Sequence, residues 1–368
     1  EITGGGPQVN VVDFNNVLGN LEIVGDGDND GVTVVGTAAG DTFTMVDPAA
    51  GAPDVRVGLE VGGTAYVPVD AIFVETVAAS GGEGNDRLTV DVAGSPGLIG
   101  EAQLGFHGGL GQDELRVTGD PVNDPTTVEY TPGPANDEGT LGYLDGGGND
   151  LMRINFTGLE PIIDTVATTD ELVVNGTNAA NAINYEVGPN SGTSVVGDQS
   201  SGLVSVDGFE TIEFTNKPEL IINGLAGSDE IDLNNTNTPT GLTDITVNGG
   251  DPTGSDRVVV NNTATGTPIV FTPDPADDEA GTVTGAQPTD VSLTGTEELL
   301  INGQGAGDSL TVVGTSNNDT FTVTPGATVD AGSVQTNNLL PMSFTALGAQ
   351  ASLTMNDGPG GDNDAIVY

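Results

Sequence analysis

The sequence predicts an all-β protein that forms a parallel β-helix, or β-solenoid, of about 13 short coils. Three observations lead to this prediction. Glycine accounts for 57 of the 368 residues, at a density that disfavours long helices. Between the glycines, the β-branched residues Val, Ile and Thr recur together with Phe, which is the composition of strands. The third observation is internal repetition on two length scales.

The long repeat is about 140 residues. The dipeptides Gly36-Thr37, Gly176-Thr177 and Gly314-Thr315 open similar stretches, and successive copies recur at this interval. We therefore expect one continuous array of copies. Its predicted parts are a partial repeat at 1–35, full units at 36–175 and 176–313, and a partial unit at 314–368.

The short repeat is a glycine-rich acidic turn followed by a strand. GGEGND at 81–86 and GGLGQD at 108–113 start about 27 residues apart, and each precedes an alternating apolar stretch. Alternation with period two predicts a half-buried strand. An interval of about 27 residues fits one coil with three short strands, stacked in parallel so that similar turns lie above one another. The alternative is a series of antiparallel β-sandwiches of about 140 residues each.

Two proline-bearing acidic segments, 121–140 and 268–290, interrupt the short repeat and predict loops or hairpins that project from the solenoid. Each contains an acidic cluster at an equivalent position, Asn136–Glu138 and Asp277–Glu279. These clusters are candidates for binding cations or a neighbouring subunit. Solvated loops are the alternative interpretation.

Charge excludes several classes of function. The chain has 54 acidic and six basic residues and a formal net charge of −48. Without a basic surface, we expect no nucleic-acid partner and no attraction to an anionic membrane. No apolar run approaches the roughly 18 residues of a membrane span, so we expect no membrane insertion. The absence of cysteine excludes disulfides and thiolate chemistry.

The turns carry the chemistry of a calcium site. Glycine permits positive φ and exposes backbone carbonyls, and the following Asp adds a hard carboxylate oxygen. Ca²⁺ prefers such oxygens and takes about six to eight of them, more than one turn supplies but within reach of two stacked turns. Alternatively, the Asp residues only close the turns. The predicted metal ligands are Asp28, Asp30, Asp86, Asp113, Asp150, Asp229, Asp256, Asp308, Asp319, Asp362 and Asp364.

The segments 81–86 and 108–113 resemble the GGxGxD core of the RTX, or haemolysin-type, calcium-binding repeat, and each is followed after one residue by Leu. This resemblance implies that Asp86 and Asp113 bind Ca²⁺, together with glycine carbonyls, between adjacent coils of a parallel β-roll. The family repeats its motif in tandem, whereas the copies here are separated. The wider pattern of 297–323 is similar to long bacterial extracellular repeat proteins, which implies an extracellular or cell-surface location.

Catalytic patterns are weak. His107 is the only histidine and occupies a turn position where the next copy has Asn248. We therefore expect a non-enzymatic, secreted structural repeat protein of a fibre, surface layer or matrix, rigidified by Ca²⁺. Expected partners are further copies of the chain, in a filament or layer, and cell-surface polysaccharide. The alternatives are the stalk of a calcium-dependent adhesin and a solenoid carbohydrate-active enzyme.

Overall fold

The computed structural model describes residues 2–3, 21–25, 29–48, 55–93, 102–121, 124–191, 200–250, 255–263, 267–305, 307–359 and 364–368. Every helix or strand found in this part of the chain is a β-strand, and the strands belong to two mixed sheets, A and B. The all-β prediction is therefore confirmed. The chain divides into unit 1 (Glu1–Leu172, Asn190–Gln199 and Gly208–Lys217) and unit 2 (Val173–Pro189, Ser200–Asp207 and Pro218–Tyr368).

Unit 1 contributes strands to both sheets. In sheet A the spatial order is β1 (Ile2–Thr3), β2 (Leu21–Val24), β7 (Val69–Ile72), β5 (Val55–Val61), β4 (Asp41–Val46), β9 (Arg87–Asp91), β11 (Glu114–Thr118), β15 (Ile162–Asp164) and β19 (Ile212–Phe214), with β6 (Thr64–Ala65) beside β5. In sheet B it is β3 (Gly31–Val35), β8 (Thr76–Glu83), β10 (Gln103–Leu110), β14 (Asp150–Thr157), β13 (Glu138–Leu144) and β12 (Thr127–Pro132).

Unit 2 has the same plan, and β16 (Glu171–Asn175) of sheet B contains the boundary between the units. Its sheet A order is β18 (Gly202–Val206), β17 (Ala182–Val187), β21 (Glu230–Leu233), β23 (Arg257–Asn261), β27 (Glu298–Asn302), β31 (Met342–Thr345), β30 (Gly332–Thr336), β29 (Thr320–Pro325) and β33 (Ala365–Val367). Its sheet B order is β20 (Glu219–Asn223), β22 (Asp244–Asn248), β26 (Asp290–Thr294), β25 (Gly281–Thr284), β24 (Ile269–Pro273), β28 (Ser309–Val313) and β32 (Ser352–Asn356).

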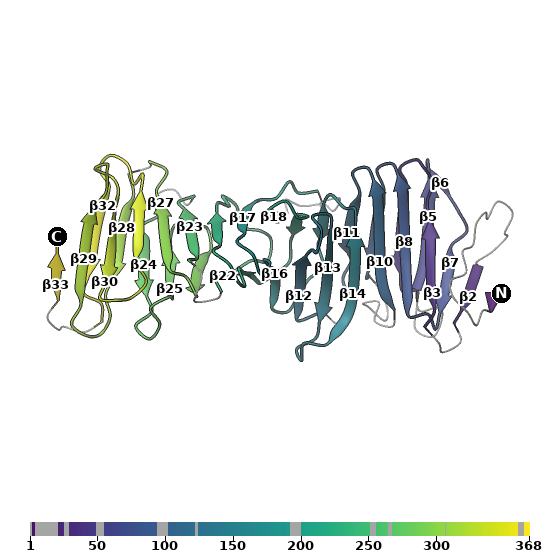
Figure 1. The fold of residues 1–368 in the computed structure, drawn as a ribbon, viewed down its shortest axis with the longest axis horizontal. Coiled ribbons are helices and arrows are strands. Elements are labelled where there is room, and N and C mark those ends of the chain that lie inside the picture. Colours follow the sequence, from purple (N-terminus) through teal and green to yellow (C-terminus); the bar gives the residue numbers. More distant parts are fainter. Residues whose placement is uncertain are drawn as a thin grey trace. The chain divides into compact units, whose positions relative to one another are not determined.

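Parallel pairing follows the short repeat of the sequence. Thr76 of β8 pairs with Gln103 of β10, and Arg87 of β9 pairs with Glu114 of β11, so both pairs join positions that are one short repeat apart. In unit 2, β21 and β23 pair at the same interval. Figure 1 shows β8, β10 and β14 side by side in unit 1. From β8 to β11, and again from β20 to β23, consecutive strands therefore alternate between the two sheets, and each strand returns beside the equivalent strand of the preceding interval.

One part of the coil prediction is wrong. Three strands were expected per interval, but the fully described interval from Glu219 to its partner Asp244 contains two, β20 and β21. After β21, side-chain amides donate hydrogen bonds to backbone carbonyls. Asn235 donates from Nδ2 to the carbonyl of Glu186 (3.0 Å), and Gln287 donates from Nε2 to the carbonyl of Leu233 (3.1 Å). The remaining side of the interval is therefore a turn stabilised by side chains.

Antiparallel hairpins make the sheets mixed, whereas the sequence predicted coils stacked only in parallel. The proline-bearing segments form the hairpins β12–β13 and β24–β25, as predicted. The expectation that these hairpins project from the solenoid is wrong, because their strands pair with neighbouring strands of sheet B. Further hairpins are β4–β5, β17–β18 and β29–β30 in sheet A. Their first strands begin at Asp41, Ala182 and Thr320, so the hairpins follow the long repeat of the sequence.

The core of unit 1 lies between its sheets. Phe43 of β4 in sheet A and Phe106 of β10 in sheet B meet edge to face, with ring centroids 6.4 Å apart. Both side chains are fully buried. The alternation seen in the sequence appears as burial, because Leu115 and Val117 of β11 are buried while their neighbours are half-buried. This packing holds the turns between β8 and β9, and between β10 and β11, at fixed positions.

Candidate metal-binding turns

The acidic turns share a local geometry in which the Asp folds back over the first glycine. A Cβ atom built on Gly81 would lie 2.1 Å from Oδ2 of Asp86, and one on Gly108 would lie 2.7 Å from Oδ2 of Asp113. No side chain fits at these positions. The close approach of the carboxylate therefore requires glycine at these two positions.

In unit 1 these acids form a hydrogen-bonded row, which we call the first carboxylate ladder. The backbone N–H of Asp41 donates to Oδ1 of Asp86 (2.7 Å), and the N–H of Asp86 donates to Oδ1 of Asp113 (2.7 Å). The N–H of Asp113 donates to Oε2 of Glu160 (3.3 Å). Asp41, Asp86 and Asp113 are all at most 2% exposed. Each of the three accepting carboxylates thus satisfies a backbone donor of the neighbouring turn.

Unit 2 contains a second carboxylate ladder with the same order. The N–H of Asn181 donates to Oδ1 of Asp229 (2.7 Å), and the N–H of Asp229 donates to Oδ1 of Asp256 (2.8 Å). The N–H of Asp256 donates to Oε2 of Glu297 (2.6 Å). Each member follows its counterpart in unit 1 by one long repeat of the sequence. The ladder is therefore part of the repeating unit, with an amide replacing the first carboxylate.

The remaining predicted ligands divide into several settings. The N–H of Asp319 donates to Oδ1 of Asp364 (2.9 Å), and the N–H of Asp30 donates to Oε2 of Glu75 (2.8 Å). Asp308 is buried, 6% exposed, and folds over Gly303. Asp150 is exposed and pairs with Arg153 (2.8 Å), so it lies apart from the buried acids. Asp28 and Asp362 lie outside the described residues.

Burial makes three of the ladder carboxylates weaker acids. Burial raises the pKa of Asp86 to about 6, an effect that the hydrogen bond from Asp41 opposes and the charges of Asp113 and Asp41 reinforce. Burial also raises the pKa of Asp113 and that of Asp229. Oδ2 of each of these three residues is buried without a hydrogen-bond partner. Either a proton or a cation beside Oδ2 would relieve this desolvation.

The acidic hairpin tips that the sequence singled out lie beside the glutamate ends of the ladders. The N–H of Gly158 donates to the carbonyl of Asp137 (2.7 Å), and the N–H of Thr296 donates to the carbonyl of Glu279 (3.0 Å). Near the first tip, burial raises the pKa of Glu210 to about 8, and the charges of Glu160 and Asp137 add to the shift. Negative charge is thus concentrated where each ladder ends.

The donor set limits which metal would fit. No group of three or more His, Cys, Asp or Glu side chains lies close enough to hold a metal ion in the described ranges. A cation beside Oδ2 of Asp86 or Asp113 would therefore need backbone carbonyls and water to complete its shell. Ca²⁺ accepts such mixed oxygen ligands, so the Oδ2 atoms without hydrogen-bond partners are suitable ligands for it. Each ion would be bound by few carboxylates.

Sequence reasoning missed several members of the ladders. Asp41 and Asn181 follow Gly36 and Gly176 by five residues, the spacing that joins Gly81 to Asp86, so a search on spacing alone would have found them. The glutamates at the ends of the ladders occur in shorter Gly-x-Glu sequences, and their neighbouring residues gave no sign that they belong to the ladders. These glutamates are Glu160 and Glu297, with Glu75 accepting in the same way from Asp30.

The basic residues are all engaged by acids. Their partners lie 2.6–3.1 Å away: Arg56 with Asp70, Arg87 and Arg116 with Glu114, Arg153 with Asp150, Lys217 with Asp164, and Arg257 with Glu230. Arg87, Arg116 and Arg257 pair with glutamates that lie on strands, and not with the Asp of the adjacent turn. None of the bases therefore neutralises a ladder carboxylate by a direct ion pair within the described chain.

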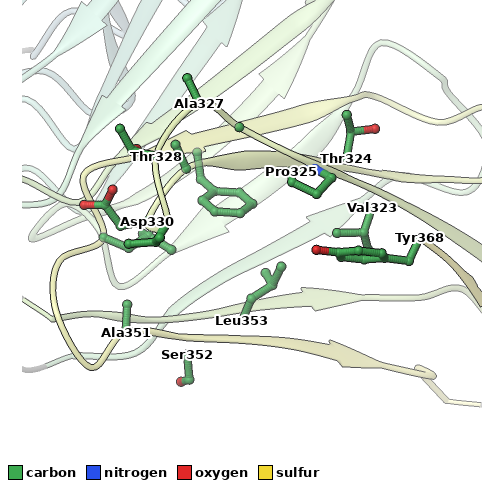
Figure 2. Close-up of a pocket in the computed structure, with 15 residues that line it drawn as sticks. Val323, Thr324, Pro325, Ala327, Thr328, Asp330, Ala351, Ser352, Leu353 and Tyr368 are labelled. Carbon is green, nitrogen blue, oxygen red and sulfur yellow. The ribbon is translucent and has the colours of Figure 1, made fainter.

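A pocket of about 520 Å³ lies in unit 2, away from the acidic turns (Figure 2). Its walls come from the β29–β30 hairpin and from β32, with Tyr368 beside Val323. Asp330 is the one acidic residue among its lining residues, and none of the predicted metal ligands belongs to it. The pocket is therefore separate from the candidate metal-binding turns.

No protein-family model matches the chain, and no curated protein is significantly similar to it. The described residues contain no helix long and apolar enough to cross a membrane.

Proposed function

We propose that the chain is a segment of an extracellular structural repeat protein, built as a β-solenoid and stiffened by Ca²⁺ at its acidic turns. The carboxylate ladders carry this proposal. They repeat in both units, they follow the parallel register of the strands, and they place desolvated carboxylates on successive turns. A repeated row of this kind suits a mechanical role better than catalysis, which needs one unique site.

The solenoid is supported by strand register. Parallel partners are about one short repeat apart in the chain where two simple intervals stack, as in β20–β22 and β9–β11. They are farther apart where a hairpin intervenes, as between Thr42 of β4 and Arg87 of β9. Strands that return to the same sheet at such intervals are the pattern of a coiled chain with hairpins inserted into some coils.

Calcium is supported by electrostatics. The formal charge of −48 is unscreened by bases, and Oδ2 of Asp86 and of Asp113 is buried without a hydrogen-bond partner. A divalent cation would reduce repulsion between stacked carboxylates and supply Oδ2 with a partner. A ligand that binds only the folded state raises stability in proportion to the logarithm of its concentration.

Self-association is the second part of the proposal, with another copy of this chain as the partner. β33 exposes Ile366, at 60%, and Val367, at 51%, and Tyr368 beyond it is 90% exposed. Exposed strands with apolar side chains pair readily with further strands. End-to-end contact through β33 would extend the sheets into a filament.

A calcium titration tests the proposal. Thermal melting and circular dichroism are followed from EGTA to millimolar Ca²⁺, with Mg²⁺ and NaCl as controls, and sedimentation of the same samples reports assembly. We expect Ca²⁺ alone to raise the melting temperature sharply and EGTA to reverse it. Equal stability in EGTA and Ca²⁺ would show that the Asp residues only close turns. A single monomeric species at high protein concentration with Ca²⁺ would exclude self-association.

A further inference from the structure

Unit 1 contains a buried lysine–aspartate pair that the acidic turns do not involve. Asp164 ends β15, and Lys217 follows β19, the parallel neighbour of β15 in sheet A. Lys217 Nζ lies 3.1 Å from Asp164 Oδ2, and both side chains are 0% exposed. Lys217 is the only lysine of the chain. The arginines that pair with acids have side chains 18–50% exposed, so the Lys217–Asp164 pair is much more deeply buried.

The pair is held in a fixed orientation. Lys217 Nζ also donates to the carbonyl oxygen of Val166, and Oδ1 of Asp164 accepts the N–H of Val166 (2.9 Å). The amine nitrogen and the carboxylate oxygen are therefore held at hydrogen-bond distance by contacts to the same short segment. Such constraint replaces a bimolecular encounter by an intramolecular one, which favours bond formation by a large factor.

The surroundings favour the neutral form of the Lys217 amine. Burial lowers the pKa of Lys217, although Asp164 opposes this shift. The fully buried Tyr143 of β13 lies beside Asp164, and burial, followed by the charge of Asp164, raises the pKa of its hydroxyl well above its usual value. Isolated charges are costly in such an environment, so proton transfer from ammonium to carboxylate is promoted. An uncharged amine beside an uncharged carboxylic acid is the reactive combination.

We propose that Lys217 and Asp164 form an intramolecular isopeptide bond. The ammonium first gives a proton to the carboxylate, and the amine lone pair then attacks Cγ of Asp164. A new Nζ–Cγ bond forms, one Cγ–O bond breaks, and the hydroxyl leaves with one amine proton as water. The Tyr143 hydroxyl lies beside Asp164, where we expect it to assist departure of the hydroxyl. No oxidant or second reactant is needed, because –NH₃⁺ and –COO⁻ yield –NH–CO– and H₂O.

The bond would have a structural consequence. It would link the end of β15 to the segment after β19 and close a covalent loop over all of the chain between Asp164 and Lys217. It would also replace a buried amine and a buried carboxyl group by one neutral amide. Pulling the chain between these positions would then load a covalent bond instead of hydrogen bonds between strands.

Intact mass spectrometry of the full chain under denaturing conditions tests the proposal directly. We expect a mass lower than that calculated from the sequence by one water, about 18 Da. The Lys217→Arg variant should have its full calculated mass. After cleavage by a glutamate-specific protease, which cuts between the two positions at Glu171, the peptides that contain Asp164 and Lys217 should remain joined.

Each outcome decides the question. A shifted fraction that grows during incubation of the folded protein also supports the bond, and Tyr143→Phe should slow that growth. The full calculated mass for the folded wild-type chain, unchanged on prolonged incubation, would overturn the proposal and leave an ion pair. This decision needs only the wild-type protein, so it does not depend on whether a variant folds.

Discussion

Replacing Asp86 by Asn should stabilise unit 1 at neutral pH when Ca²⁺ is absent. The amide oxygen can still accept the N–H of Asp41, while the buried charge disappears. An amide already occurs in the second ladder, where Asn181 stands at the position that Asp41 has in the first ladder and accepts from its own turn. There, Asn181 Oδ1 accepts the N–H of Thr177 (2.7 Å).

The magnitude follows from the pKa of Asp86, which burial raises from 3.8 to about 6. Two pKa units correspond to about 3 kcal/mol of unfolding free energy, at 1.36 kcal/mol per unit. An acid with a raised pKa destabilises the fold only when it is ionised there. The penalty is therefore absent below pH 3.8, grows between pH 4 and 6, and is complete above the folded-state pKa.

Urea unfolding in EGTA, followed by circular dichroism at pH 4 and pH 7, measures the effect. The stability difference between Asp86→Asn and wild type should increase by about 2.5 kcal/mol from the lower to the higher pH. Asp120→Asn, at an exposed position, removes the same charge and should show little change. A difference that is independent of pH would refute the argument from desolvation.

The same variant connects to the calcium proposal. In millimolar Ca²⁺ the wild type would gain a cation beside Oδ2, and Asp86→Asn would lose that ligand. Its advantage in EGTA should therefore shrink or reverse in Ca²⁺. An equal advantage in both buffers would place Asp86 outside any metal site while leaving the ladder intact.

Two further predictions concern other positions of unit 1. Glu210→Gln should be more stable than wild type at pH 9 by roughly 2–5 kcal/mol and should lose this advantage near pH 4, because the pKa of Glu210 is about 8; urea unfolding at both pH values checks this. Gly111→Ala should cost more than about 2 kcal/mol, since its Cβ would lie 1.5 Å from the carbonyl oxygen of Gly84. Gly148→Ala, in open space at φ +77°, should cost about 1 kcal/mol, and equal melting temperatures for the two variants would contradict the steric argument.

Much of the local structure could be predicted from sequence because its causes are local. The alternation after the turn at 81–86 predicted β9, and the spacing between this turn and the one at 108–113 predicted the parallel pairing of β9 with β11. The prolines and acids at 121–140 predicted the β12–β13 hairpin. Residues close in the chain determine both the turn conformation and the face on which a side chain lies.

The candidate site was predicted only in part. Glycine followed by Asp predicted turn residues such as Asp86 and Asp113, and both lie buried in one ladder. Asp150 follows a similar glycine-rich segment but lies at an exposed hairpin turn, where Asp145 accepts the N–H groups of Gly147 and Asn149. The glycine-rich motif predicts a turn both before Asp86 and before Asp150. Whether the next turn stacks on it depends on strand pairing, which the motif does not contain.

By itself, the sequence determined the strand composition, the turn positions, the repeat lengths and the excess of negative charge. Tertiary structure decided which acids meet. Asp86 meets Asp113 one short repeat later, but the path back to Asp41 is longer, because the β4–β5 hairpin lies between the equivalent strands. Tertiary structure also brought Lys217 to Asp164 in the core of unit 1. Such contacts depend on how far the chain travels before it returns to the same sheet, and that distance is set by long-range strand pairing.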